Sequence, residues 1–463
     1  MDPAHHVPAP HVPAGHVLAH GLGGRTDLPL DAVAAIAGGG IAVAASFLAL
    51  TLAWKRPRLH PSAGRPLPPA LARVLDAAAL TRTGRVLALA AAALVVAVAF
   101  AGPPATGANL APWALYVTFW VGLVPASVLL GPVWRRVNPL RTLHAALCRA
   151  TRTSPAGRRA LPPRLGYWPA AAWLTGFVWL ELVAPNRSDP RAVGALILAY
   201  AAVNLALAWW FGRDWFTRGD GFEAYSTLLA RMSPLGRRGG GTPALPAPPA
   251  AGATSPARPL VLRTPLTGLM TGTAEPGLTA AACVLIGSTG FDGVTRTTYW
   301  RDNVDPSSVP AGTLGLAAAI AAVAALYVAA LRLSARLTGQ DPAALPGRFA
   351  ATLLPIALGY TVAHYFSFLV LEGQTTFILL GDPFGTGLDL FGTAGNRVDH
   401  DLAGPTLTAQ VQVNAIVLGH IAGTVAAHDL ALRSPARALH GQLPVAAVMV
   451  ALTCAGLFAL LSG

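Results

Sequence analysis

The stretch GRVLALAAAALVVAVAFAG, residues 84–102, decides the fold of this chain. It is long enough to cross the hydrocarbon core of a bilayer as a helix, which takes about 20 mostly apolar residues. Inside lipid there is no water to satisfy the backbone, so such a segment must make its hydrogen bonds internally as a helix. The sequence therefore predicts a membrane-spanning helix here.

Nine further stretches resemble this one, which predicts an all-α, polytopic transmembrane helix bundle of about ten spanning helices. The sixth is the weakest, because it is short and runs into the Gly- and Ser-rich residues 287–293. The ten predicted spans are 31–54, 84–102, 110–132, 167–184, 192–212, 276–292, 312–333, 348–371, 406–428 and 444–461.

The composition of the whole chain agrees with a membrane bundle. Of the 463 residues, 54% are hydrophobic and only 11% are charged, whereas a soluble domain carries about 25% charged residues. The mean hydropathy is +0.52. These values exclude a soluble enzyme and a disordered protein. The three cysteines have no metal-binding spacing and lie away from the outer side, so a disulfide scaffold is excluded as well.

The formal charge of +13 indicates orientation rather than a nucleic-acid partner. Basic residues gather in the cytoplasmic loops of membrane proteins. If both termini lie outside, all but six of the 33 lysines and arginines fall on the cytoplasmic side, where they can contact anionic lipid headgroups. The composition is rich in Ala, Gly, Pro and Arg, which is typical of a high-GC bacterium and predicts a bacterial cell membrane. The six outer basic residues are Arg25, Arg187, Arg191, Arg296, Arg301 and Arg397.

The chain divides into two five-helix halves around a linker. Residues 1–30 form an outer, His-rich segment, and the halves comprise residues 31–238 and 259–463. Between them, residues 239–258 are a cytoplasmic linker of mostly Gly, Pro and Ala, a composition that does not pack.

Three further segments are predicted outside the spans. Residues 140–150 and 222–234 have apolar residues at helical spacing and are predicted to be interfacial cytoplasmic helices. The Gly-rich segment 378–395 is predicted to be an outer re-entrant or capping segment over a cavity, with Asp382 and Asp389 on its rim.

Few ionisable groups lie within the predicted spans, and each is a functional candidate because burying it in lipid is costly. They include His364, His420 and Glu181, with Glu372 and Asp292 at helix ends. Two interpretations of the histidines stay open. They could form a metal or proton site, or each could donate to a backbone carbonyl and hold two helices together.

Five stretches resemble the actinobacterial membrane proteins called fenitrothion hydrolases. The resemblance implies hydrolysis of the P–O bond of an apolar organophosphate phosphotriester. It also implies a divalent metal held by His364, His420 and His20, with Glu181, Glu372 or Asp292 as ligand or general base. The matching stretches are HGLGGRTDLPL (20–30), GYWPAAAWLTGFVWLELVAP (166–185), LGYTVAHYFSFLVLEGQ (358–374), GDPFGTGLDLFGTA (381–394) and GHIAGTVAAHDLAL (419–432).

Two other functions remain open at this point. Ten helices in two sets of five have the parity of an inverted repeat, as in secondary transporters. Glycines interrupt the first helix at residues 38–40 and the sixth at residues 287–293, which would mark a central binding site. A copper- or other metal-handling protein is the third possibility, because five of the twelve histidines lie in the first thirty residues.

Overall fold

The computed structural model describes residues 31–238, 259–270, 274–433 and 439–462, and helices make up most of these residues. The all-α polytopic bundle predicted from the sequence is confirmed. Its long helices are α1 (Ala32–Ala53), α3 (Ala78–Ala101), α8 (Trp168–Leu182), α9 (Pro190–Phe211), α12 (Leu278–Arg296), α14 (Val309–Thr338), α16 (Leu354–Leu380), α17 (Pro405–Ala431) and α18 (Leu439–Leu461), together with the continuous run of α4 (Leu110–Trp113), the π-helical η2 (Ala114–Val121) and α5 (Leu123–Leu130).

Within the described ranges, nine helical segments are long and apolar enough to cross a membrane. The fourth predicted span, 167–184, is not among these nine, and it forms α8, which has 15 residues. At 1.5 Å per residue α8 is about 22 Å long, shorter than the hydrocarbon core of about 30 Å. The chain is therefore a multi-pass membrane protein in which every predicted span is helical and one of them is short.

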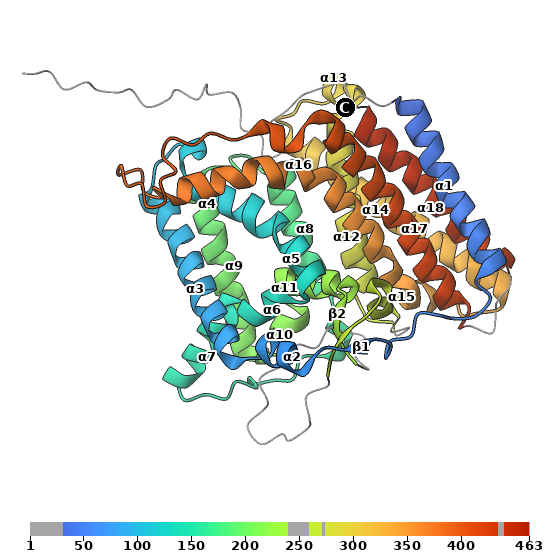
Figure 1. The fold of residues 1–463 in the computed structure, drawn as a ribbon, viewed down its shortest axis with the longest axis horizontal. Coiled ribbons are helices and arrows are strands. Elements are labelled where there is room, and N and C mark those ends of the chain that lie inside the picture. The colour runs from blue at the N-terminus through green and yellow to red at the C-terminus, as the bar shows by residue number, and fades with distance from the viewer. Residues whose placement is uncertain (1–30, 239–258, 271–273, 434–438, 463) are drawn as a thin grey trace, which may run out of the picture.

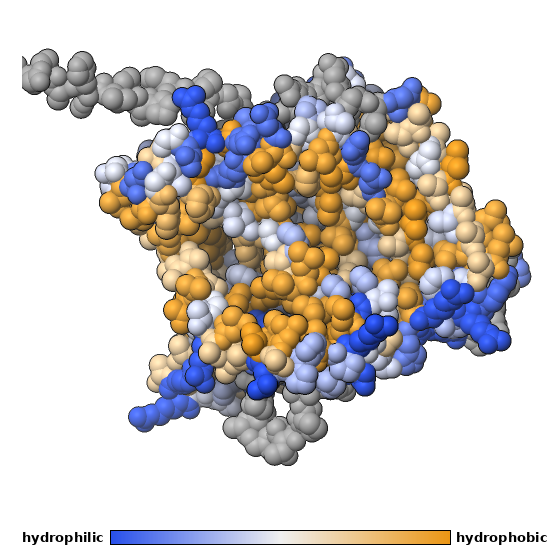
Figure 2. All heavy atoms as spheres, in the orientation of Figure 1, coloured by the Kyte–Doolittle hydropathy of each residue, from blue (hydrophilic) through white to orange (hydrophobic). Residues whose placement is uncertain are grey.

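The ends of the bundle agree with an even number of crossings. Figure 1 shows that α1 begins and α18 ends on the same side of the molecule. Figure 2 shows a broad apolar band across one face, with hydrophilic residues gathered along its upper and lower margins. This distribution matches a helix bundle that exposes apolar side chains to lipid between two aqueous surfaces.

The helices pack in two groups that do not follow the order of the chain. Helix α1 packs against α17 and α18, and α12 and α14 belong to the same group. Helices α3, α9 and α4 form the second group, on the left of Figure 1. The two groups meet where α8 packs on α12 and where η2 packs on α16.

Small residues let α1 approach α18 closely. A Cβ atom built on Gly39 would lie 2.4 Å from Leu457, and one on Gly40 would lie 2.8 Å from the Cys454 sulfur. Glycines at such contacts bring helix backbones together inside membranes. Gly39 and Gly40 are therefore a packing surface within a continuous helix, and residues 38–40 do not interrupt α1.

Helix α12 is longer and more central than the sequence suggests. It runs through the Gly- and Ser-rich residues to Arg296, so the predicted interruption at 287–293 is wrong. The Ser288 and Thr289 hydroxyls donate to the Leu285 carbonyl, which satisfies them inside the helix. Most of α12 is buried against other helices, so it does not need the apolar surface of a lipid-facing span.

On the side that the loop charges predict to be cytoplasmic, short helices and a small sheet cover the bundle. The sheet has the order β1-β3-β2, with both pairs antiparallel. The strands are β1 (Arg65–Pro66), β2 (Leu235–Arg237) and β3 (Leu260–Leu262), and the helices are α2 (Pro69–Leu75), α6 (Val133–Val137), α7 (Pro139–Ala150), α10 (Trp215–Arg218), α11 (Gly221–Leu229), η4 (Ala230–Met232), η5 (Pro265–Leu269) and α15 (Leu345–Phe349). Helix α7 exposes Leu143 and Leu147.

The prediction of an interfacial helix at 222–234 is wrong. Every residue of α11 and η4 is buried. The two charged residues in this segment are themselves buried and ion-paired, with Glu223 bound to Arg141 and Arg231 bound to Glu275. An alternation of apolar and charged residues therefore reflects internal ion pairs here, and not a water-facing surface.

On the outer side, α16 continues to Leu380 and is followed by turns, with the short helix α13 (Thr298–Asn303) on the same side. Asp382 accepts hydrogen bonds from the backbone N–H groups of Thr386 and Gly387. Asp389 does the same for Thr393 and Ala394. These two carboxylates therefore stabilise turns, which is the usual role of Asp in loops.

The cytoplasmic ends of α1 and α17 are joined by one carboxylate. Asp429 is fully buried and accepts hydrogen bonds from the Trp54 indole and from the backbone N–H groups of Arg58 and Leu59. Arg433 completes the set at 3.0 Å. This arrangement fixes the chain that leaves α1 against the end of α17.

The close approach of α1 to α18 gives a matched test. Replacing Gly39 by Leu places a side chain where Leu457 already lies, and overpacking of this kind costs about 1–3 kcal/mol. Gly38 has nothing within 4 Å of its Cβ direction, so Gly38→Leu is the control. Thermal unfolding in detergent should show a lower unfolding temperature for Gly39→Leu alone. Equal unfolding temperatures for the two variants would contradict this packing.

Candidate functional site

Chemistry-bearing side chains gather where α8, α12 and α16 meet in the outer half of the bundle. They are Glu181 from α8, Asp292 and Arg296 from α12, and His364 and Tyr365 from α16, and we call these five residues the outer cluster. All but Arg296 are at most 7% exposed. Three helices are needed to assemble the outer cluster, and α12 packs against both of the others.

Asp292 is shared between an imidazole and a guanidinium. Its Oδ2 atom lies 3.4 Å from His364 Nδ1 and 2.9 Å from Arg296 Nη2. Arg296 follows Asp292 by one helical turn, and 39% of its side chain is exposed, whereas the Asp292 and His364 side chains are buried. The carboxylate thus faces one buried basic group and one that reaches solvent.

Glu181 and Tyr365 form a second pair beside the first. The Tyr365 hydroxyl lies 3.4 Å from Glu181 Oε1, and Glu181 is fully buried in the last turn of α8. Since His364 and Tyr365 are consecutive, with ring centroids 6.4 Å apart, the two carboxylates approach the same turn of α16.

Two other predicted site residues lie outside the outer cluster. Glu372 lies two turns beyond His364 on α16, about 12 Å along the axis, where the Thr375 hydroxyl bonds it at 3.4 Å. His420 is fully buried, its Nδ1 lies 2.9 Å from the Ile416 carbonyl oxygen, and its ring packs against Tyr360. That geometry matches the interpretation of a histidine that bonds a backbone carbonyl. His20 lies outside the described residues.

The metal predicted from the sequence finds no ligand set in this part of the chain. Among the described residues, no group of three or more His, Cys, Asp and Glu side chains could hold a metal ion. In the outer cluster, the guanidinium of Arg296 lies 2.9 Å from Oδ2 of Asp292, and its positive charge would repel a metal cation there. The described residues therefore do not fit a metal.

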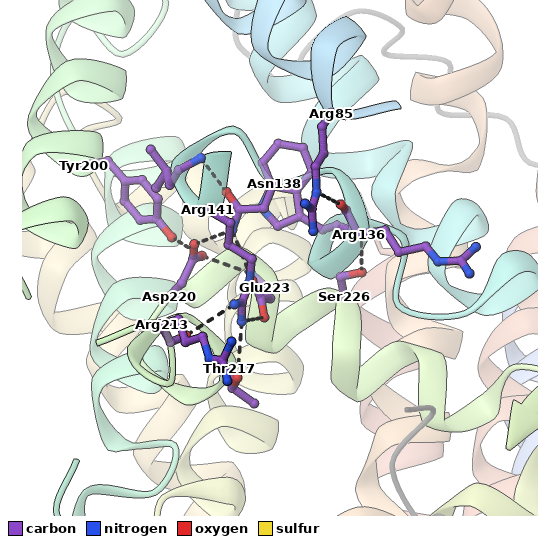
Figure 3. A network of polar contacts seen from close by, with 12 residues as sticks. Arg85, Arg136, Asn138, Arg141, Tyr200, Arg213, Thr217, Asp220, Glu223 and Ser226 are labelled. Carbon is purple, nitrogen blue, oxygen red and sulfur yellow. Dashed lines mark hydrogen bonds and ion pairs between the residues drawn. The ribbon is translucent and has the colours of Figure 1, made fainter. Parts of the chain in front are cut away.

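Sequence reasoning missed two members of the outer cluster and a second polar network. Tyr365 and Arg296 have no motif that marks them. Figure 3 shows the second network on the cytoplasmic side, where Asp220, Glu223 and Asn138 are fully buried. Arg141 is one of the basic residues that indicate orientation in the sequence, and it also belongs to this network.

The cytoplasmic network joins α7, α9 and α11 through two carboxylates. Arg141 binds both oxygens of Glu223, at 2.6 and 2.7 Å. Asp220 accepts hydrogen bonds from the Tyr200 hydroxyl at 2.6 Å and from the Asn138 amide at 3.0 Å, and it also caps α11 through the backbone N–H of Glu223. A bidentate Arg–carboxylate pair is among the strongest side-chain contacts, so this network fixes three helices relative to one another.

No protein-family model, curated protein or solved structure matches the chain.

Asp220 gives a pH-dependent prediction. Burial, and next the charge of Glu223, raise the pKa of Asp220 to about 6, above its ordinary value of 3.8. The folded protein then holds a proton that the unfolded chain releases, so stability falls as pH rises from about 4 to about 6. Unfolding temperatures in detergent should show this fall, and Asp220→Asn should reduce it. Asp214→Asn, at an exposed neighbour, should leave it unchanged. A fall of the same size in Asp220→Asn would refute the assignment.

Proposed function

We propose that the protein is a membrane transporter coupled to protons, in which the outer cluster binds and releases the coupling proton. The observation that carries this proposal is the buried Asp292–His364 pair. Ionisable groups within membrane spans are costly, so those that persist generally line proton or substrate pathways. A histidine beside a carboxylate is suited to this task, since imidazole exchanges protons near neutral pH.

The geometry suggests how a proton changes the site. With His364 neutral, Asp292 is balanced mainly by Arg296. A proton on His364 creates a second cation next to the same carboxylate, and Asp292 then binds the buried imidazolium more strongly. Arg296, whose side chain is already part-exposed, is released towards solvent. The outer cluster therefore has two charge arrangements that differ by one proton.

Glu181 and Tyr365 extend this exchange to the neighbouring helix. Their 3.4 Å contact gives a second acceptor and a hydroxyl that can pass a proton between oxygens. Because α16 carries both His364 and Tyr365, a small shift of this helix changes both pairs together. The proposal rests on these pairs and not on an inverted repeat, since α1 packs with the second half of the chain.

Proton binding can be measured without knowing the transported substrate. Liposomes carrying the protein, adsorbed on a solid-supported membrane, should give a transient current after a rapid pH change. We expect Asp292→Asn and His364→Gln to reduce this current to the level of protein-free liposomes. Glu372→Gln is the matched control, because it also converts a buried carboxylate to an amide, but outside the outer cluster. The proposal would be rejected if both cluster variants gave a current as large as that of the wild type.

Hydrolysis of a phosphotriester is the second candidate function, and the same dyad is the observation that favours it. A carboxylate that orients an imidazole is the arrangement of a general base. His364 would take a proton from water as the water oxygen attacks phosphorus. The bond from phosphorus to the leaving phenolate would then break, and the phenolate would leave with its electron pair. The resemblance to fenitrothion hydrolases supports this reaction class.

The two candidates are separated by one further measurement on the same samples. If the hydrolase is correct, purified protein should release 4-nitrophenolate from diethyl 4-nitrophenyl phosphate, and His364→Gln should abolish the release. Glu372→Gln should keep it. Equal rates for the wild type and His364→Gln would eliminate the hydrolase and leave the transporter proposal untouched.

A further inference from the structure

A groove lies on the side of α16 that faces away from the outer cluster. Gly373, which lines the groove, follows His364 by nine residues. At 100° per residue, this spacing places the two residues on opposite faces of α16. The groove has a volume of about 1020 Å³ and is bounded by α16, by the junction of η2 with α5, and by the segment 395–397. This volume is at the upper end of the range of about 300–1,000 Å³ for ligand pockets.

Glycines create the space. Gly122, Gly373 and Gly395 line the groove, and a Cβ on Gly373 or Gly395 would have nothing within 4 Å. The opposite wall is formed by Thr118 of η2 and by Gly122, which follows η2. A π-helical turn is wider than an α-helical one and often marks a functional site.

The groove is apolar along its length and basic at its outer end. Leu369 and Phe377 of the membrane-spanning helix α16 line it, and Phe377 is 56% exposed. At the outer end lie Asn396 and Arg397. No hydrogen bond or ion pair joins Arg397 to any other described residue, and its side chain is exposed.

A side-chain amide holds the basic end in place. The Gln374 amide donates to the Asp399 carbonyl at 3.1 Å and accepts from the Asp399 N–H at 2.9 Å. These two bonds fix the segment that carries Asn396 and Arg397 to α16, beside the groove. The basic end is therefore built into the fold, and few basic residues lie on this side of the bundle.

We propose that the groove binds an anionic phospholipid of the outer leaflet. An acyl chain lies along Leu369, Gly373 and Phe377, and the phosphate meets Arg397. Charge complementarity at the outer end selects an anionic over a zwitterionic headgroup, because basic pockets between membrane helices bind anionic headgroups. This site is independent of the proposed proton exchange, since it uses the other face of α16.

The test compares two lipids with identical acyl chains. Detergent-purified, delipidated protein is mixed with phosphatidylglycerol or phosphatidylcholine, and bound lipid is counted by native mass spectrometry. The wild type should retain phosphatidylglycerol at least tenfold more strongly. Gly373→Leu, which fills the groove, should lose this lipid. Gly38→Leu is the matched control, because Gly38 is also a helical glycine with open space at its Cβ position, and it should bind as the wild type does.

Arg397→Gln separates the headgroup from the acyl chain. This variant should bind the two lipids equally, since only the charge is removed. A preference for phosphatidylglycerol that survives Arg397→Gln, or unchanged binding by Gly373→Leu, would overturn the proposal. A change of oligomeric mass in Gly373→Leu would also overturn it, because the groove would then be an interface between copies. Should Gly373→Leu fail to fold, Gly395→Leu fills the same space from the segment 395–397.

Discussion

A carboxylate buried in a membrane bundle has to be neutralised by the protein itself, and Asp292 lies between two basic side chains, Arg296 and His364. This constraint explains why α12 takes the centre of the molecule. Arg296 can reach Asp292 only if the helix continues one turn past it, and His364 can reach it only if α12 packs on α16. The polar residues at 288–293 are tolerated because neighbouring helices, and not lipid, surround them.

The outer cluster and the cytoplasmic network solve the same electrostatic problem differently. At the cytoplasmic end, Arg141 binds both oxygens of Glu223, and such a pair leaves the carboxylate little freedom to exchange partners. In the outer cluster the contacts to His364 and from Tyr365 are 3.4 Å long, beyond the usual range of about 2.7–3.2 Å. Loose contacts of this kind suit groups that change partners, whereas the bidentate pair suits a fixed joint.

Hydropathy and loop charge were enough to predict the helical class, the ten helical stretches and the shared side of the two ends. They failed where burial by protein replaces burial by lipid. Helix α12 looked weak as a span because it contains polar residues, which are tolerated because protein surrounds the helix. Helix α11 looked interfacial because it combines apolar and charged residues, but these charges form ion pairs inside the protein. The contact between Asp292 and His364 could not be predicted from the sequence, because it depends on which helices pack together. His420 and His364 look alike in the sequence, yet one contacts a backbone carbonyl and the other a carboxylate.

The position of α1 has a consequence for how the chain is assembled. Trp54 and Asp429, which bond each other, are 375 residues apart, and the helices that pack on α1 are the last two to be made. During synthesis α1 therefore enters the bilayer long before its partners exist, and it must remain a stable single helix in lipid until then. The apolar surface of α1 is sufficient to keep the single helix stable in lipid. The glycines at 39 and 40 become useful only when α18 arrives, so α1 docks long after it is inserted.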